Sequence, residues 1–305
     1  MKGLVLKSTG SFYQVQVEGN IMECRIKGKF RTKGIVTTNP VSVGDLVTVE
    51  KEQDGRGIIT EIEPRKNYII RKSTNLSKQA HIVAANIDTA FLVVTLIAPE
   101  TSFGFIDRFL VSCEAFGVPV VIVFNKIDQY ADESLEVIQQ IINYYESIGY
   151  DCLTTSATDG TNIKELTRLM SGKVSLLSGH SGVGKSSLLN AVYPEWEVRV
   201  GDISSVHQKG QHTTTFAEMF PLPEGGFLVD TPGIKGFGII DIEKDELALY
   251  FPEMKELLSD CKFYNCKHIN EPGCAVKQAV QEGQIADWRY QSYLSLMNDD
   301  EGPYR

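Results

Sequence analysis

The sequence predicts a multidomain α/β protein in which a small β-barrel precedes a parallel sheet and a helical module follows it. Three observations predict this order. Short strands separated by glycine turns occupy residues 1–63, apolar runs typical of buried parallel strands recur between 118 and 229, and cysteines gather between 261 and 274. The 305 residues of the chain are enough for two or three such domains.

The composition is that of an ordinary globular protein. Hydrophobic residues make up 42% of the chain and charged residues 23%. No apolar run approaches the roughly 18 residues of a membrane-spanning helix, and the first residues lack the apolar core of a secretory signal. We therefore expect a cytoplasmic monomer that does not bind a membrane.

The net charge of −9 hides a difference between the two ends of the chain. Residues 1–80 contain 14 Lys and Arg against 8 Asp and Glu, a balance of +6. The other 225 residues contain 16 against 31, a balance of −15. This asymmetry indicates that the N-terminal part meets a polyanion, although the chain as a whole is acidic.

The N-terminal part is predicted to be a small barrel. Alternating segments at 12–17, 21–26, 41–49 and 57–62 are separated by turn residues. Several short strands within about 60 residues favour the five-stranded oligonucleotide-binding (OB) type of barrel.

A row of basic residues begins in one of these segments. If the backbone stays extended, alternate side chains share one side of the strand, with Phe30 nearby, and on this barrel type they suggest contacts with RNA phosphates. The alternative is an ordinary solvated strand face. The row is Arg25, Lys27, Lys29, Arg31 and Lys33, and Arg65, Lys66, Arg71 and Lys72 extend the positive region.

The most specific motif is a phosphate-binding loop, G-x-x-x-x-G-K-[ST]. A predicted buried strand at 173–178 precedes it and a predicted helix follows, which is the context that the motif requires. Its glycines let backbone N–H groups converge on phosphate oxygens, and the helix N-terminus adds its positive dipole end. We predict that Lys185 contacts the β- and γ-phosphates and that the Ser186 hydroxyl binds Mg²⁺. The nucleotide-binding residues here are Gly179, His180, Ser181, Gly182, Val183, Gly184, Lys185, Ser186 and Ser187.

Two further motifs are predicted to read the base. An Asp carboxylate after a buried strand can accept two hydrogen bonds from guanine, and adenine offers no such donor pair, so Asp128 opposes ATP. A second segment, after a short strand at 151–155, is predicted to contact the guanine oxygen through its backbone. The residues of the two motifs are Asn125, Lys126, Ile127 and Asp128, then Ser156 and Ala157.

Two segments are predicted to sense the γ-phosphate. Asp230 follows a strand at 226–229 and is placed to bind Mg²⁺ through water, and the N–H of Gly233 is placed to touch the γ-phosphate. A threonine-rich segment between the phosphate loop and this strand offers one more Mg²⁺ ligand. We expect this ligand to be Thr214, with Thr213 as the alternative.

The order of these motifs is the reverse of that in an ordinary GTPase, because the guanine motifs precede the phosphate loop. The same parallel sheet can still form, since contacts rather than chain order define the packed core. We therefore predict an OB-type barrel at 1–68, a circularly permuted P-loop GTPase domain at 69–238 and a helical zinc-binding domain at 239–305.

The C-terminal cysteines have a spacing that suits tetrahedral Zn²⁺. Three thiols and one imidazole form the pattern C-x4-C-x-H-x5-C, with Pro272-Gly273 supplying a turn before the last ligand. Helices are expected on either side, at 246–258 and 275–283. A disulfide, disfavoured in a reducing cytoplasm, or unrelated thiols are the alternatives. The predicted ligands of one structural zinc ion are Cys261, Cys266, His268 and Cys274.

The barrel, the permuted motifs and the cysteine cluster together resemble the bacterial ribosome small subunit-dependent GTPase A family over essentially the whole chain. The resemblance implies binding to the small ribosomal subunit and its rRNA and a role late in its maturation. It also implies GTP hydrolysis that the subunit stimulates. We expect hydrolysis to time release from the subunit. An RNA-binding module that uses GTP only as a structural ligand is the alternative function.

Catalysis is predicted to need help from outside the nucleotide motifs. In many small GTPases a glutamine after the Asp-x-x-Gly segment orients water, whereas here Ile234 holds that position and cannot. A slow basal rate is expected. His212 is the nearest candidate to hold the water, acting with Lys185 and Thr214, and the alternative is that His212 only packs the loop.

Overall fold

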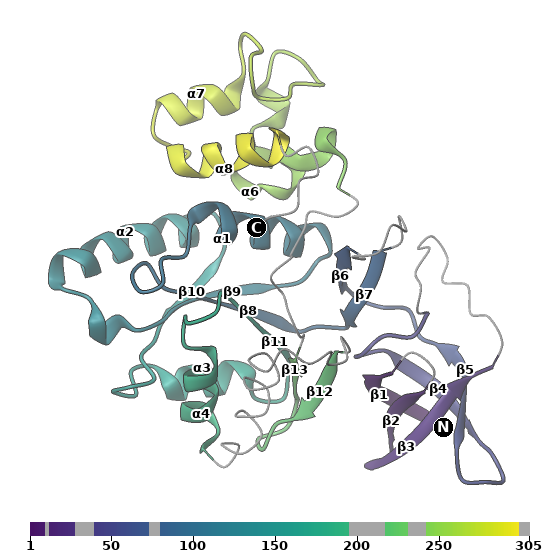
Figure 1. Cartoon of the computed structure of the whole chain (residues 1–305). Helices are drawn as coiled ribbons and strands as arrows, with labels where there is room; N and C mark the ends of the chain where they lie inside the picture. Colours follow the sequence, from purple (N-terminus) through teal and green to yellow (C-terminus); the bar gives the residue numbers. More distant parts are fainter. Residues whose placement is uncertain (10–11, 28–39, 73–79, 195–216, 231–241, 299–305) are drawn as a thin grey trace.

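The computed structural model describes residues 1–9, 12–27, 40–72, 80–194, 217–230 and 242–298. The described elements form an N-terminal barrel, a central sheet covered by helices on both faces, and a C-terminal helical module above one of those faces (Figure 1). This arrangement confirms the predicted fold class.

The barrel closes through five strands, β1 to β5. The sheet runs in the order β1-β2-β3-β5-β4, and β1 also pairs with β4, which closes the barrel. Successive side chains of a strand point to opposite faces, and those that point into the barrel are fully buried, among them Val5, Tyr13, Val15 and Ile59. The strands are β1 (Lys2–Ser8), β2 (Tyr13–Val17), β3 (Asn20–Ile26), β4 (Leu46–Lys51) and β5 (Gly57–Ile62).

Strand β4 begins later than the alternating segment at 41–49 predicts. Gly44 has a φ of +87°, and a Cβ atom added there would overlap the Ala85 carbonyl oxygen. Glycine adopts this conformation without strain, and this allows the backbone to turn sharply before Leu46. The turn brings the barrel against β7 (Ala80–Ala85), which pairs with β6 (Tyr68–Lys72) in a separate two-stranded sheet.

The central sheet contains five parallel strands and one antiparallel edge strand, in the order β10-β9-β8-β11-β13-β12. Beyond its edge, β12 pairs with β1, so that the sheet continues into the barrel, and the Lys7 ammonium lies 2.7 Å from the Glu218 carboxylate at this junction. The strands are β8 (Thr89–Val94), β9 (Val120–Phe124), β10 (Asp151–Thr154), β11 (Val174–Ser178), β12 (Glu218–Pro221) and β13 (Phe227–Asp230).

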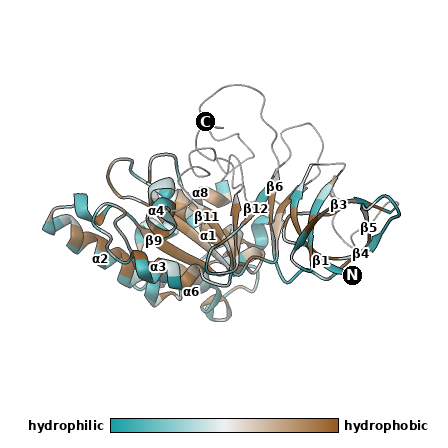
Figure 2. Cartoon of the chain, turned by 90° about the horizontal axis from the view of Figure 1, so that it is seen from below, coloured by the Kyte–Doolittle hydropathy of each residue, from teal (hydrophilic) through white to brown (hydrophobic). Residues whose placement is uncertain are grey.

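Helices cover both faces of this sheet. Helices α1 (Phe103–Ala115) and α2 (Asp132–Ser147) lie on one face, and α3 (Ile163–Met170) and α4 (Lys185–Val192) lie on the other (Figure 1). The strands are coloured as hydrophobic along most of their length, and the helices carry hydrophilic residues outward (Figure 2). Continuous apolar runs are expected in strands that are buried on both faces.

The C-terminal module consists of short helices packed on α1. The helical stretch expected at 246–258 is present but divided into short pieces, because Pro252 lacks a backbone N–H and starts a new helix at its first position. No helix in the described ranges is long and apolar enough to cross a lipid bilayer. The elements are η4 (Lys244–Tyr250), α6 (Pro252–Lys255), η5 (Leu258–Asp260), α7 (Ala275–Gln281) and α8 (Asp287–Asn298).

Candidate nucleotide and metal sites

The predicted nucleotide motifs gather at one edge of the central sheet. Asn125 follows β9, Ser156 follows β10 shortly after its last residue, and Gly179 follows β11. These strands are parallel through β8, so their carboxyl ends meet at the same edge. Open α/β sheets bind their ligands at this edge.

Side-chain hydrogen bonds join the motifs directly. The Asn125 amide donates to the Val183 carbonyl at 2.8 Å, although the two residues are 58 positions apart. The Thr155 hydroxyl donates to the Asn125 amide oxygen at 3.1 Å, and the Ile127 N–H donates to the Thr155 carbonyl at 3.2 Å. Asn125 is buried, and these hydrogen bonds link the first guanine motif to the phosphate loop and to Thr155, the residue before the second guanine motif.

At two positions of the loop a side chain would overlap a neighbouring group. Gly179 has a φ of +143°, and a Cβ there would overlap the Val93 carbonyl oxygen. Gly184 has a φ of +95°, and a Cβ there would overlap the Asn125 amide nitrogen. Gly184 is also the N-cap of α4 and provides no side-chain acceptor for the first N–H groups of the helix. Those groups are thus directed at any anion held in the loop.

Lys185 lies folded along the loop. Its ammonium donates to the Gly179 and His180 carbonyls, each at 2.7 Å. Burial lowers the pKa of Lys185, because the charged form loses hydration. Burial and the neighbouring Lys185 lower the pKa of His180, so its neutral form is favoured. Ser186 is half-buried in the first turn of α4, whereas Ser181 and Ser187 are exposed.

The guanine end of the site is shaped by the backbone around η1 (Ile127–Gln129). Lys126 has a φ of +64°, and its ammonium donates to the Ala98 carbonyl at 2.8 Å. Asp128 is exposed in η1. Ser156 is fully buried, and its N–H donates to the Thr161 carbonyl at 3.2 Å, with Ala157 following.

Most of the residues predicted to sense the γ-phosphate fall in segments that the structure does not describe. His212, Thr213, Thr214 and Gly233 are outside the described residues. Asp230 ends β13, which pairs in parallel with β11, the strand that leads into the phosphate loop.

One segment of the site has no counterpart among the sequence predictions. Residues 95–101 follow β8 and contact both motifs: Ala98 accepts the hydrogen bond from Lys126, and a Cβ on Gly182 would lie 3.4 Å from Pro99. Beyond this segment, Phe105 in α1 contacts His180 with tilted rings whose centroids are 3.7 Å apart. Only the position of this segment at the carboxyl end of a parallel strand could have indicated its role.

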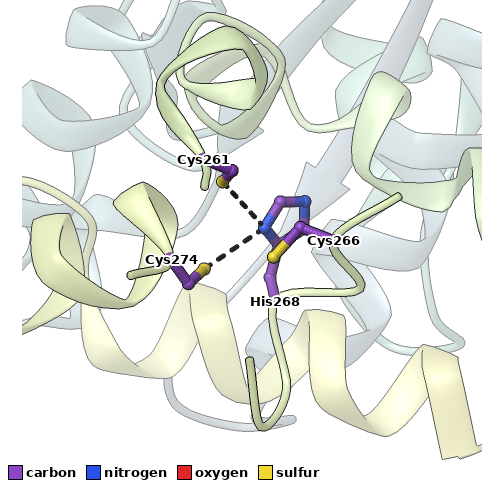
Figure 3. A group of neighbouring side chains, drawn as sticks. All are labelled: Cys261, Cys266, His268 and Cys274. Atoms are coloured by element: carbon purple, nitrogen blue, oxygen red, sulfur yellow. Dashed lines mark hydrogen bonds between the residues drawn. The ribbon is translucent and has the colours of Figure 1, made fainter. Parts of the chain in front are cut away.

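A second site gathers four potential metal ligands in the C-terminal module (Figure 3). Their ligand atoms all lie within 4.8 Å of one another. The His268 Nδ1 atom is 3.6 Å from the Cys261 sulfur and 3.4 Å from the Cys274 sulfur. Metal–ligand bonds of about 2.0–2.3 Å give a tetrahedron with edges of about 3.5–3.8 Å, so the cluster, completed by Cys266, fits a tetrahedral ion.

The surrounding residues fix this cluster in place. The Tyr290 hydroxyl donates to the His268 carbonyl at 2.6 Å, and the Tyr293 hydroxyl donates to the Lys267 carbonyl at 2.8 Å. The Cys274 sulfur accepts from the Lys277 N–H at the start of α7. The three cysteines of the cluster are free thiols, so the disulfide alternative is not what the structure shows.

The basic region at the barrel is smaller than the sequence suggests. Arg65 is largely buried and its guanidinium lies 2.6 Å from the fully buried Asp45, while Lys66 pairs with Asp88. The prediction that Arg65 extends the positive surface is therefore wrong, whereas Lys66 stays exposed beside Asp88. Arg25 is exposed and pairs with Glu52 at 2.9 Å, and Lys27 is exposed 3.9 Å from Glu50. Lys29, Phe30, Arg31 and Lys33 lie outside the described residues.

The barrel, the reversed order of motifs around one site and the three-cysteine, one-histidine cluster define a class, the circularly permuted P-loop GTPases. GTP as substrate and Mg²⁺ as its companion ion follow from this class. The family model described as RsgA GTPase matches residues 62–240, and the RsgA N-terminal domain model matches residues 2–59. The chain belongs to the RsgA GTPase family.

Relatives and solved structures agree with this assignment. The chain is 54% identical to "Small ribosomal subunit biogenesis GTPase RsgA 2" of Bacteroides thetaiotaomicron and 55% identical to the RsgA of Bacteroides fragilis, covering 100% of this chain and 99% of each relative. It is similar to the crystal structure of YjeQ from Thermotoga maritima, with a TM-score of 0.77, 36% identity and 99% of both chains covered. It is also similar to YloQ, a circularly permuted GTPase, with a TM-score of 0.74, 33% identity and coverage of 100% and 96%.

Proposed function

We propose that this GTPase acts in the cytoplasm on the small ribosomal subunit, assists its late maturation and leaves it when GTP is hydrolysed to GDP and phosphate. The relatives named above are small ribosomal subunit biogenesis GTPases and match over their whole length. The observation that carries the chemistry is the hydrogen bond from Asn125 to Val183, since it joins the guanine motif and the phosphate loop in one site. The division at 1–68, 69–238 and 239–305 is part of this proposal.

Each part of the nucleotide has residues in this site. Lys185 would leave the loop carbonyls for the β- and γ-phosphates, and the free N–H groups at the start of α4 would bind phosphate oxygens. Ser186 and Thr214 would hold Mg²⁺, which neutralises phosphate charge when bound. Asp128 would bind the guanine edge. Because the Ser156 N–H already donates to Thr161, the guanine oxygen would be bound from Ala157.

Small subunits are expected to accelerate phosphate release, because Ile234 stands where many small GTPases have a water-orienting glutamine and a slow basal rate follows. His212→Ala is expected to keep GTP affinity and to lose the acceleration by about 10²–10⁴-fold, the usual contribution of a residue that positions or activates a nucleophile. Phosphate release with and without purified small subunits measures both effects. Unchanged release on adding subunits would favour the alternative, in which GTP is only a structural ligand. Normal stimulated release in His212→Ala would limit that residue to packing.

The barrel is expected to bind rRNA phosphates through its basic row. Reversing Lys27, Lys29 and Arg31 to Glu should weaken subunit binding and flatten its dependence on salt, by about 0.7–0.9 in the log–log slope for each phosphate that the row no longer neutralises. Binding at several salt concentrations measures this slope. Lys164→Glu, an exposed position on α3, is the control. Equal slopes in the triple variant and the wild type would leave the row as a solvated face.

We propose that the four-ligand cluster holds one zinc ion with a structural role. All four positions of a tetrahedron are filled by protein atoms, so no position remains for a substrate. About one zinc ion per chain is expected by metal analysis, and chelation is expected to unfold the C-terminal module, which limited proteolysis detects. Cys274→Ser should lose the metal, whereas Cys152→Ser, outside the cluster, should retain it. A zinc-free chain with an intact module would contradict the proposal.

A further inference from the structure

Helix α1 contacts the phosphate loop on one side and the C-terminal module on the other. Its first turn is fixed by Ser102, whose hydroxyl accepts a hydrogen bond from the Phe105 N–H at 3.3 Å. Side chains two positions apart on a helix point about 200° apart, and those four positions apart share a face. Phe103 and Asp107 therefore lie on one face, and Phe105 lies on the opposite one.

On the loop side, Phe105 contacts the first variable residue of the phosphate loop. The Phe105 and His180 rings have centroids 3.7 Å apart and planes inclined by 33°. The His180 carbonyl is also one of the two acceptors that hold the Lys185 ammonium. Phe105 thus restricts the movement of His180, whose carbonyl holds the Lys185 ammonium. None of the nucleotide motifs includes Phe105.

On the module side, α8 holds α1 through a ring stack and an ion pair. The Phe103 and Trp288 rings are stacked with centroids 4.3 Å apart. One residue further along α8, the Arg289 guanidinium lies 2.6 Å from the Asp107 carboxylate, and both side chains are fully buried. These interactions leave α1 little freedom to tilt, because tilting would separate a buried charge from its partner.

We propose that Phe105 is a positioning residue of the phosphate loop. Because α8 contacts α1, the geometry of the loop then depends on the docking of the C-terminal module. This inference rests on the GTP site proposed above. GTP and GDP would bind a loop that the Phe105–His180 contact has already ordered, so that removing the contact raises the cost of ordering the loop on binding. The effect should fall on affinity more than on the chemical step.

The test compares two aromatic residues at opposite ends of α1, Phe105 in its first turn and Phe116 at its C-cap. Phe105→Ala is expected to weaken GTP and GDP binding and to raise KM by roughly threefold to tenfold, the range for one aromatic contact, while kcat changes by less than about twofold. Phe105→Tyr keeps the ring and should restore wild-type KM. Phe116→Ala is the matched control, because Phe116 is half-buried at the other end of α1 against Tyr68, with ring centroids 5.1 Å apart. It should leave KM unchanged.

Double-mutant cycles separate the effect of the Phe105–His180 contact on GTP affinity from the effect of docking the C-terminal module. Phe105→Ala and His180→Ala should be non-additive in GTP affinity, because each removes the same ring contact. Trp288→Ala should weaken GTP binding in the wild-type background and have little further effect in the Phe105→Ala background. If Phe105→Ala prevents folding, Phe105→Leu keeps apolar volume without the ring and should show a smaller rise in KM.

Several outcomes would overturn the proposal. A wild-type KM in Phe105→Ala or Phe105→Leu would make Phe105 a packing residue only. Unchanged GTP affinity in Trp288→Ala would remove the linkage to the module. Failure of the GTP site itself is distinguishable, because it would show as equal GTP binding by the wild type and Lys185→Ala, whatever the Phe105 variants do.

Discussion

Lys185→Ala is expected to lower kcat for GTP hydrolysis by about 10²–10³-fold, which is the usual loss when one preorganised donor to developing negative charge is removed. The ammonium is already at the phosphate loop, held by two carbonyls at 2.7 Å. Replacing it leaves the phosphate charge with only backbone donors and Mg²⁺. Single-turnover hydrolysis with saturating enzyme measures the loss without interference from weaker binding.

The control is a lysine outside the nucleotide motifs. Lys164 is exposed on α3, and Lys164→Ala should hydrolyse GTP at the wild-type rate. Circular dichroism should show that both variants fold. Wild-type hydrolysis by Lys185→Ala would show that the cation is not used in catalysis, and the role assigned to the loop would have to be withdrawn.

Arg289→Ala is expected to destabilise the docked C-terminal module by about 3–5 kcal/mol, the usual effect of breaking a buried ion pair. Arg289 is completely buried and contacts two carboxylates, Asp107 at 2.6 Å and Glu253 at 2.7 Å. Burial raises the pKa of Asp107 even against the opposing pull of Arg289. Without the guanidinium, two acids would remain in a dry environment with no cation to compensate them.

The measurement uses tryptophan fluorescence during denaturant unfolding. The chain has two tryptophans, so a Trp196→Phe background leaves Trp288, next to Arg289, as the reporter of the α8 environment. Arg168→Ala is the matched control. Arg168 pairs with Glu165 at a similar 2.6 Å but is 69% exposed, so it should change stability by at most about 1 kcal/mol. An effect of Arg289→Ala no larger than that of Arg168→Ala would show that burial adds nothing to this pair.

The fold class and the positions of the nucleotide motifs could be predicted because each rests on local patterns. The loop at 179–186 has required glycines, and the strand before Asn125 is a continuous apolar run. Their convergence also followed from sequence, since the carboxyl ends of parallel strands share an edge whatever the order of the chain. The hydrogen bond from Asn125 to Val183 shows that the two motifs meet at this edge.

The parts that could not be predicted depend on residues far apart in the chain. Sequence alone predicts Arg65 at the surface, because its partner, Asp45, lies 20 positions away and nothing in the sequence marks either as buried. Arg289 is likewise paired with a distant residue, because its partner Asp107 is 182 positions away in the chain. Arginines are usually exposed, so a buried one is not expected without its partner in view. The contact of Phe105 with His180 has no sequence signal, because these two residues are also far apart in the chain.

The pairing of β12 with β1 has a consequence for how the chain can be divided. An open strand at the border of a sheet presents unpaired backbone groups and promotes aggregation. Here the first strand of the barrel covers that border, with Lys7 opposite Glu218. A fragment beginning after the barrel would uncover it, so self-association should appear when residues 1–62 are removed, even though the remaining helices and strands are complete. The barrel thus acts as an intramolecular cap on its neighbour as well as a proposed contact surface for RNA.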